Sequence, residues 1–139
     1  MKKIYLDSNV LISLIREDFG KSLELMYART DEFFLATKNN ALFVLSDLFL
    51  KEVNKFAYYS AQEVFQFFEV RDINFITVGL LPEDKLVARG FVSMGMHFID
   101  ALHAAVALRT KSDFLVTWNE RDFQAVTDKI KVANPSHFV

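Results

Sequence analysis

The sequence predicts an α/β protein with three layers, α/β/α, around a mostly parallel five-stranded sheet. Two observations lead to this prediction. Five short runs rich in β-branched and aromatic residues alternate with longer stretches of helical periodicity. The short runs are apolar on both faces, which is typical of strands that helices cover on two sides. The alternation predicts strand–helix–strand units within a single domain that spans residues 1–139.

The boundaries of the expected elements follow from this periodicity and from capping signals. Pro82 fits the first position of a helix, where its missing amide hydrogen would have no partner in any case. The expected strands are Lys3–Leu6, Leu42–Leu45, Phe75–Val78, Phe114–Thr117 and Ile130–Ala133. The expected helices are Val10–Ile15, Lys21–Ala36, Asp47–Ala57, Gln62–Val70, Pro82–Met94 and Asp100–Arg109.

Composition narrows the possible functions. The 139 residues are 52% hydrophobic and include 15 phenylalanines, which is enough for a well-packed core. The chain has no cysteine, which excludes disulfides, thiolate metal sites and cysteine nucleophiles. Its net charge of −2 gives the whole molecule no strong attraction for nucleic acid. Binding to nucleic acid would therefore need a local basic patch or bound metal ions.

Nothing in the hydropathy pattern indicates a membrane segment. No run approaches the roughly 18 apolar residues of a membrane-spanning helix. The opening MKKIYLDSNVLISLI has basic residues before an apolar stretch, as a signal peptide does. Asp7 and Asn9 interrupt that stretch, however, and no small-residue cleavage site follows. We therefore expect a soluble cytoplasmic protein.

Four carboxylates lie at or beyond the places where strands give way to helices. Asp7 ends the first expected strand, Asp100 opens the last expected helix and Asp122 follows the fourth strand. In an open parallel sheet these positions lie near the carboxyl edge, where ligands bind. Glu52 lies about two turns into the helix after Ser46, so it reaches that edge only if its helix crosses the site.

Carboxylates gathered in one place repel one another, and a divalent cation is the usual reason for a fold to bring them together. Oxygen ligands, without cysteine and without a closely spaced histidine pair, favour Mg²⁺ or Mn²⁺ over zinc. Such an ion polarises a phosphoryl oxygen and lowers the pKa of a bound water. The chemistry indicated is phosphodiester hydrolysis.

Each acid also has a simpler structural explanation when it is considered alone. Asp7 or Asn9 could cap the first helix, and Asp100 could stabilise the positive end of its own helix. Glu52 could be a solvated surface charge, and Asp122 could belong to a cap-like N-x-x-D arrangement. The metal hypothesis therefore depends on the joint pattern.

That joint pattern resembles the PIN-domain ribonucleases, and most closely the VapC-type toxins of bacterial and archaeal toxin–antitoxin pairs. The family opens with D-[ST]-N-x-[LI], which Asp7–Leu11 matches as DSNVL. Its second acid follows a strand-ending Ser or Thr, as Glu52 follows Ser46. Its third acid opens a D-A-x-x-A-type helix, matched by DALHAA at 100–105, and its last element, usually T-x-D-x-D-F, corresponds to TWNERDF at 117–123.

The resemblance implies that metal-activated water cleaves RNA endonucleolytically. It assigns Asp7, Glu52, Asp100 and Asp122 as the catalytic and metal-binding residues, with Asp7 and Asp100 as the firmest ligands. Ser8, Asn9 and Asn119 would orient the ligands. The implied partners are the RNA substrate, an antitoxin protein and a second copy of the chain in a homodimer, with no membrane.

One departure from the family pattern opens an alternative. Asn119 stands where many relatives carry an acid, so it supplies a carbonyl oxygen but no charge. The number of metal ions per site, one or two, stays open for this reason. The alternative is a catalytically inactive PIN-like module that binds RNA or a protein partner.

Two other phosphoryl-transfer families fit the sequence poorly. A haloacid-dehalogenase-type phosphatase needs an aspartate where Asn9 stands, and a phospho-receiver domain needs an acid at the end of a middle strand, where Phe75–Gly79 has none.

His103 is flanked by alanine and leucine, which favours a hydrogen-bonded structural histidine over a general acid or base. Aromatic residues between Phe56 and Phe68 exceed the needs of one helix face, so the surplus is expected to serve a dimer contact or a partner helix.

Overall fold

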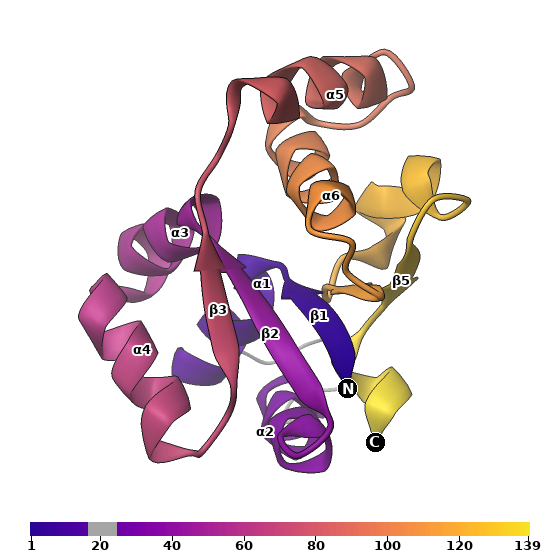
Figure 1. The fold of residues 1–139 in the computed structure, drawn as a ribbon. Coiled ribbons are helices and arrows are strands. Elements are labelled where there is room, and N and C mark those ends of the chain that lie inside the picture. Colours follow the sequence, from indigo (N-terminus) through magenta and orange to yellow (C-terminus); the bar gives the residue numbers. More distant parts are fainter. Residues whose placement is uncertain (17–24) are drawn as a thin grey trace.

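A five-stranded parallel sheet forms the middle layer of the protein, in the order β3-β2-β1-β4-β5 (Figure 1). The computed structural model describes residues 1–16 and 25–139. All neighbouring strands pair in parallel, so their carboxyl ends share one edge of the sheet. The predicted α/β class and five-stranded sheet are confirmed. The strands are β1 (Lys2–Leu6), β2 (Ala41–Ser46), β3 (Phe75–Val78), β4 (Phe114–Val116) and β5 (Lys131–Ala133).

Helices connect the strands and form the outer layers. They are α1 (Ser8–Ile15), α2 (Leu25–Thr37), α3 (Asp47–Ala57), α4 (Ala61–Val70), α5 (Pro82–Val92) and α6 (Phe98–Arg109), with the 3₁₀ helices η1 (Glu120–Val126) and η2 (Pro135–Phe138). The first four residues of the helix predicted over Lys21–Ala36 lie outside the described residues, and the rest falls within α2.

One helix boundary differs from its prediction in a way that bears on the site. Helix α6 begins at Phe98, so Asp100 lies in its first turn and does not open the helix. The N-cap is His97, which makes no side-chain cap hydrogen bond. The sequence consequently offers no Ser, Thr, Asp or Asn signal at the true start of the helix.

The alternation of side chains along each strand divides the core into two layers. Ile4 and Leu6 point to the face that α1, α2, α3 and α4 cover, where buried phenylalanines fill the space. Tyr5 points to the opposite face and packs with Val44 and Leu115 under α5, α6 and η1. Figure 1 shows the two sets of helices on either side of the sheet.

Strand β3 is less covered than the sequence suggested. It lies at the edge of the sheet and pairs with β2 alone. Ile76 is 38% exposed, although the apolar run predicted cover on both faces. The reason is tertiary, because α6 packs over the centre of the sheet around Tyr5 and Leu115 and leaves the outer face of β3 open.

The strand order reverses between β1 and β4, and this is the point that positions the site. The Asp7 amide donates to the carbonyl of Val116 at 3.0 Å, just past the end of β1. The Thr117 amide donates to the carbonyl of Ala133 at 3.0 Å, so Thr117 continues β4 at the same level. Residues that follow β1 and β4 therefore lie side by side at the carboxyl edge, where open parallel sheets bind ligands.

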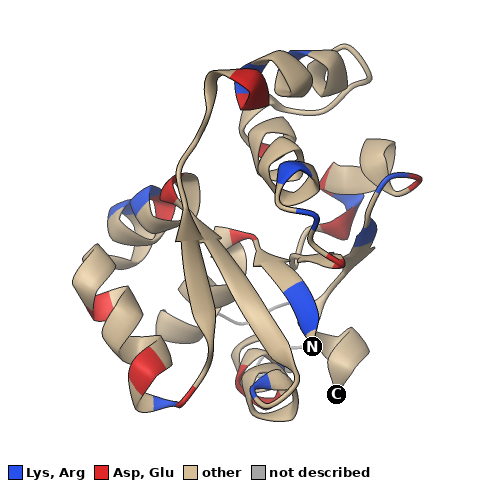
Figure 2. Cartoon of the chain, in the orientation of Figure 1, with Lys and Arg blue, Asp and Glu red and all other residues tan. Residues whose placement is uncertain are grey.

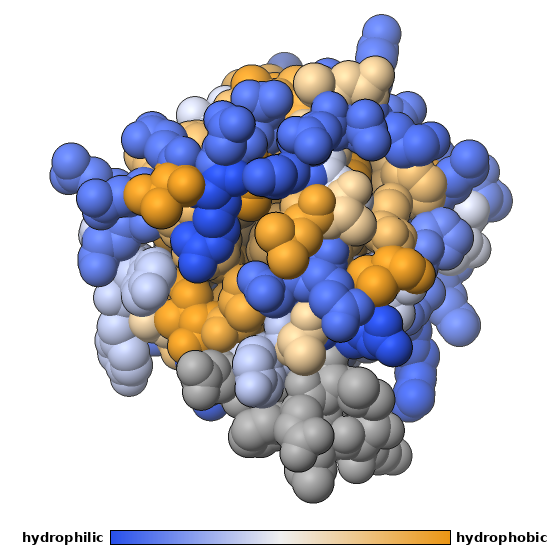
Figure 3. All heavy atoms as spheres, turned by 90° about the horizontal axis from the view of Figure 1, so that it is seen from below, coloured by the Kyte–Doolittle hydropathy of each residue, from blue (hydrophilic) through white to orange (hydrophobic). Residues whose placement is uncertain are grey.

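The surface carries scattered charge and divided apolar patches. In the described part of the chain, lysines and arginines are spread over several separate elements (Figure 2). On the face seen in Figure 3, hydrophobic residues lie in patches separated by hydrophilic ones. Among the aromatic residues between Phe56 and Phe68, Phe68 is fully buried, whereas Phe56 is 46% and Tyr58 85% exposed. Within the described ranges, no helix has both the length and the apolar character that a membrane span requires.

The buried aromatic layer gives a direct test of the core. Phe68 packs edge-on against Phe34, with ring centroids 5.6 Å apart, and has no exposed surface. We expect Phe68→Ala to lower the free energy of unfolding by about 3–5 kcal/mol, because it removes a large buried side chain and leaves a cavity. Chemical denaturation measures this loss.

The matched control is Phe56→Ala, which removes the same side chain from a half-exposed position. We expect it to change the free energy of unfolding by no more than about 0.5 kcal/mol. Equal losses in the two variants would contradict the core assignment.

Candidate active site

Asp7 is the N-cap residue of α1, but its side chain is held by the segment that follows β4. It lies between β1 and α1 with extended backbone, and its side chain makes no cap hydrogen bond. Its Oδ2 instead accepts a hydrogen bond from the Thr117 hydroxyl at 2.8 Å. The side chain is almost fully buried. Asp7 thus occupies the N-cap position, as the capping explanation expected, but its carboxylate bonds to Thr117 and not to the helix, and it faces the carboxyl edge of the sheet.

Thr117 is the centre of a small polar network that fixes Asp7. Its hydroxyl accepts hydrogen bonds from Asn9 Nδ2 at 3.1 Å and from the Asn119 amide at 3.0 Å while it donates to Asp7. Asn9 Oδ1 also accepts from the Trp118 amide at 3.1 Å. Asn9 thus ties the start of α1 to the segment after β4, which keeps the two strand ends at a fixed separation.

Glu52 reaches the same edge because α3 crosses it. Ser46 ends β2, and its hydroxyl accepts from the Phe49 amide at 3.1 Å, which caps α3. Glu52, inside that helix, accepts from the Ser8 hydroxyl at 3.1 Å and from His103 Nε2 at 2.6 Å, both on Oε1. Its side chain is only 21% exposed. The solvated-charge explanation for Glu52 is wrong.

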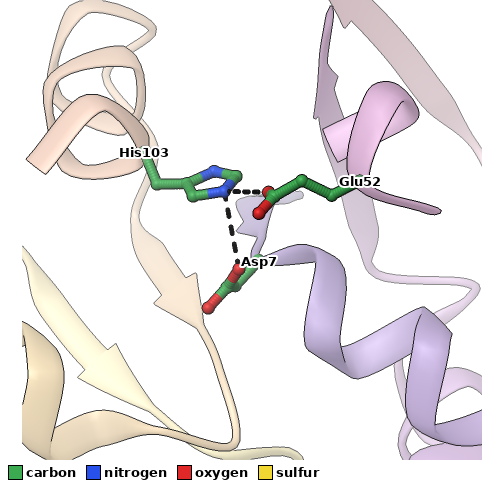
Figure 4. A group of neighbouring side chains, drawn as sticks. All are labelled: Asp7, Glu52 and His103. Carbon is green, nitrogen blue, oxygen red and sulfur yellow. Dashed lines mark hydrogen bonds and ion pairs between the residues drawn. The ribbon is translucent and has the colours of Figure 1, made fainter. Parts of the chain in front are cut away.

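His103 joins the two acids from the other side of the sheet. It projects from α6, and its Nε2 lies 3.6 Å from Asp7 Oδ1 as well as 2.6 Å from Glu52 Oε1 (Figure 4). One potential ligand atom from each of the three residues lies within 4.8 Å of the others. The prediction that His103 is hydrogen-bonded is confirmed, although its partners are residues of the site.

A second hydrogen bond orients the His103 ring from behind. Nδ1 lies 2.6 Å from the hydroxyl of Tyr5, which lies 2.9 Å from the hydroxyl of Ser46. All three side chains are buried. Sequence reasoning missed Tyr5, although a hydroxyl inside an otherwise apolar strand and an imidazole in an alanine-rich helix are both signals of a buried polar contact.

Asp100 and Asp122 lie close enough to interact electrostatically but stay outside the group of three. Asp100 is in the first turn of α6 and Asp122 is in η1. Burial, followed by the negative charges of Asp7 and Asp122, raises the pKa of Asp100 to about 6. The side chain of Asn119, at the start of η1, makes no cap hydrogen bond.

The pKa values of the inner residues reflect the same crowding. Burial raises the pKa of Asp7, against the opposing influence of His103 and Thr117. Burial alone would lower the pKa of His103, but its hydrogen bond to Glu52 and the charges of Asp7 and Glu52 raise it. Burial also raises the pKa of the Tyr5 hydroxyl, which therefore keeps its proton.

The carboxylate oxygens of this site suit a small divalent cation. A carboxylate oxygen of Asp7 and one of Glu52 lie within 4.8 Å of each other. The negative charge of Asp7 also raises the pKa of Asp100. Buried acids whose charges oppose one another are stabilised by a cation, and carboxylate oxygens are ligands that Mg²⁺ and Mn²⁺ accept. A metal centre is therefore compatible with the chemistry of the residues present.

Solved structures share this fold. VapBC2 from Rickettsia felis, bound to a promoter DNA fragment, matches with a TM-score of 0.65 and 14% identity over 95% of this chain and 98% of that chain. This chain has the fold of the VapC toxins. VapC20 from Mycobacterium tuberculosis, described as a toxin that cleaves the Sarcin–Ricin loop, matches with a TM-score of 0.58 and 12% identity over 91% of this chain and 95% of that one. No protein-family model and no curated protein matches the chain by sequence.

The crowding of acids on this VapC fold predicts how stability depends on pH. The folded-state pKa values of Asp7, Asp100 and His103 are all raised, so the metal-free folded protein binds more protons than the unfolded chain. Stability should therefore fall as pH rises from about 4, where unfolded aspartates titrate, through 6 and beyond. Thermal unfolding in a chelator measures this fall.

Asp100→Asn should make this fall shallower between the unfolded pKa of aspartate and about 6, since the amide does not titrate. Mn²⁺ should raise the melting temperature more at pH 7.5 than at pH 5, because it binds the ionised acids. A metal-free melting temperature that rises steadily across this pH range would contradict the assigned crowding.

Proposed function

We propose that this protein is a divalent-metal-dependent endoribonuclease that hydrolyses RNA phosphodiester bonds, acting in the cytoplasm as the toxin of a toxin–antitoxin pair. The observation that carries the proposal is the meeting of Asp7 and Glu52 at His103, from separate elements, at the strand-order reversal of a VapC fold. Such a crevice is where α/β sheets bind ligands, and buried acids gathered there need a cation.

Each residue of the site has a place in this proposal. Asp7, Glu52, Asp100 and Asp122 would hold Mg²⁺ or Mn²⁺. When bound, the ion polarises a phosphoryl oxygen and lowers the pKa of a water molecule. Ser8 donates to Glu52, and Thr117 donates to Asp7, so each of these carboxylates keeps a fixed orientation. Asn9, through its side chain, and Asn119, through its backbone amide, both donate to the Thr117 hydroxyl and so help to orient it toward Asp7.

The net charge of the chain supports the need for a cation at this site. At −2 the protein repels a polyanion as a whole, and its basic residues are spread over several elements (Figure 2). A bound divalent ion would supply positive charge at the point where the phosphodiester must lie. RNA binding near the site, and not only RNA cleavage, should therefore depend on the metal.

The partners are proposed from the solved structures. VapC20 is described as a toxin that cleaves the Sarcin–Ricin loop, and VapBC2 as a complex bound to DNA from its promoter. By analogy, we propose an RNA substrate and an antitoxin protein for this chain. A homodimer is proposed on a separate ground, because the exposed side chains of Phe56 and Tyr58 are available for a protein contact.

One observation favours a second candidate function. Asn119 supplies no charge beside Asp122, so the site has one carboxylate fewer than the family pattern. A PIN-like module that binds RNA or a protein without cleaving it would tolerate this change. Retention of Asp7, Glu52, Asp100 and Asp122 favours the nuclease, because a binding module has no need for four mutually repelling acids.

A cleavage assay separates the two candidates. We expect the protein to cut single-stranded RNA with Mg²⁺ or Mn²⁺ and to lose this activity in a chelator. Asp7→Asn and Asp100→Asn should each lower the rate by about 100-fold or more, since each removes a charged ligand of the ion. The rate is followed by gel electrophoresis of end-labelled RNA.

The matched control is Asp128→Asn, which removes an exposed acid paired with Lys129 and should leave the rate unchanged. Metal-independent cleavage, or full activity in Asp7→Asn, would overturn the nuclease. Binding of RNA without cleavage by the unmodified protein would favour the module.

A further inference from the structure

A chain of polar side chains leads from the sheet into the site, and the proposed reaction uses only its last member, Glu52. It runs from Ser46 through Tyr5 to His103 and ends on Glu52. The hydroxyl of Tyr5 and the ring of His103 are at most 1% exposed. Buried polar groups cost stability unless every one of them is paired, so a fully paired chain of this length indicates a defined role.

The contacts limit the hydrogens of this chain to two arrangements. Ser46 Oγ accepts from the Phe49 amide, and its own hydrogen can go to Tyr5. Tyr5 then donates to His103 Nδ1, which leaves the ring hydrogen on Nε2. If Tyr5 donates to Ser46 instead, Nδ1 must carry a hydrogen to donate to Tyr5.

The second arrangement still requires a hydrogen on Nε2. A ring with its only hydrogen on Nδ1 would set the Nε2 lone pair against the oxygen lone pairs of a metal-binding Glu52 carboxylate, whose Oε1 lies 2.6 Å away. That contact is repulsive, whereas Nε2–H donating to a carboxylate is a strong charge-assisted hydrogen bond. In either direction of the chain, therefore, His103 donates to Glu52.

We propose that His103 is a positioning residue, held by Tyr5 and Ser46, that orients the Glu52 carboxylate toward the metal. The inference rests on the metal site of the proposed function. It assigns Glu52 Oε1 to the donors Ser8 and His103 and leaves the second oxygen for the ion. Asp7 follows the same plan, since Thr117 donates to Oδ2, while Oδ1 lies 3.6 Å from His103 Nε2, on the side of Glu52.

This role differs from ligation by the imidazole. A metal-bound nitrogen must present its lone pair, and Nε2 is engaged as a donor to Glu52. A donor that fixes a ligand typically affects metal affinity by about 10–100-fold when it is removed. The two roles can be separated because only ligation places a nitrogen on the metal.

The experiment measures Mn²⁺ affinity by calorimetry in wild type, His103→Leu, His103→Gln and Tyr5→Phe. We expect His103→Leu to weaken Mn²⁺ binding by about 10–100-fold. His103→Gln should recover part of the loss, since its amide can still donate to Glu52. The Mn²⁺ affinity of Tyr5→Phe should lie between those of wild type and His103→Leu, because the His103 ring is retained but loses the hydrogen bond that fixes its orientation. Thermal unfolding checks that each variant is folded, and His137→Leu, which removes an exposed imidazole, is the control.

Electron spin echo spectroscopy of the Mn²⁺-loaded wild type provides the second measurement. We expect no directly coordinated nitrogen. A coordinated nitrogen that disappears in His103→Leu would overturn the positioning role, and so would unchanged or tighter Mn²⁺ binding in His103→Leu.

These outcomes are distinct from failure of the nuclease. The expected order of Mn²⁺ affinities without RNA cleavage by wild type would uphold the role of His103 and overturn the proposed function. Cleavage by wild type with equal affinities in all variants would do the reverse. A wild type that binds no Mn²⁺ would overturn both.

Discussion

Repulsion between carboxylates that share a small, partly buried volume is the constraint on which this structure depends. Asp7 tolerates it because Thr117 donates to one of its oxygens, and Glu52 because Ser8 and His103 donate to Oε1. Burial and neighbouring charge still raise the pKa of Asp100 to about 6. The folded protein therefore keeps an unfavourable arrangement that a divalent cation would relieve, a pattern typical of functional sites.

Most of the fold follows from local pattern. The alternation of apolar runs and helical stretches identifies the parallel sheet, and the ends of β3 and α3 agree with their predictions. Helix α6 begins two residues before the predicted start at Asp100, because His97 caps it without the side-chain hydrogen bond that the sequence pattern would reveal. The exposed outer face of β3 was missed because a strand's hydropathy does not tell which helices will pack against it.

The candidate site is only partly predictable for a related reason. Asp7 was placed correctly at the carboxyl edge from its position after an apolar strand. Glu52 required α3 to cross the site, and its contact with His103 joins residues 51 positions apart in sequence. The contact between His103 and Tyr5 spans 98 positions. A single sequence gives the residue types at such positions but does not tell which of them will meet.

The central claim is that Asp7, Glu52 and their neighbours hold a divalent cation at the reversal of strand order. Anomalous X-ray diffraction from crystals grown with Mn²⁺ tests it most directly, because the ion is located independently of any assay. The account predicts a peak within ligand distance of oxygens from Asp7 and Glu52, with Asp100 facing it and His103 bonded to Glu52. A peak elsewhere on the protein, or none at a Mn²⁺ concentration that saturates binding in solution, would contradict it.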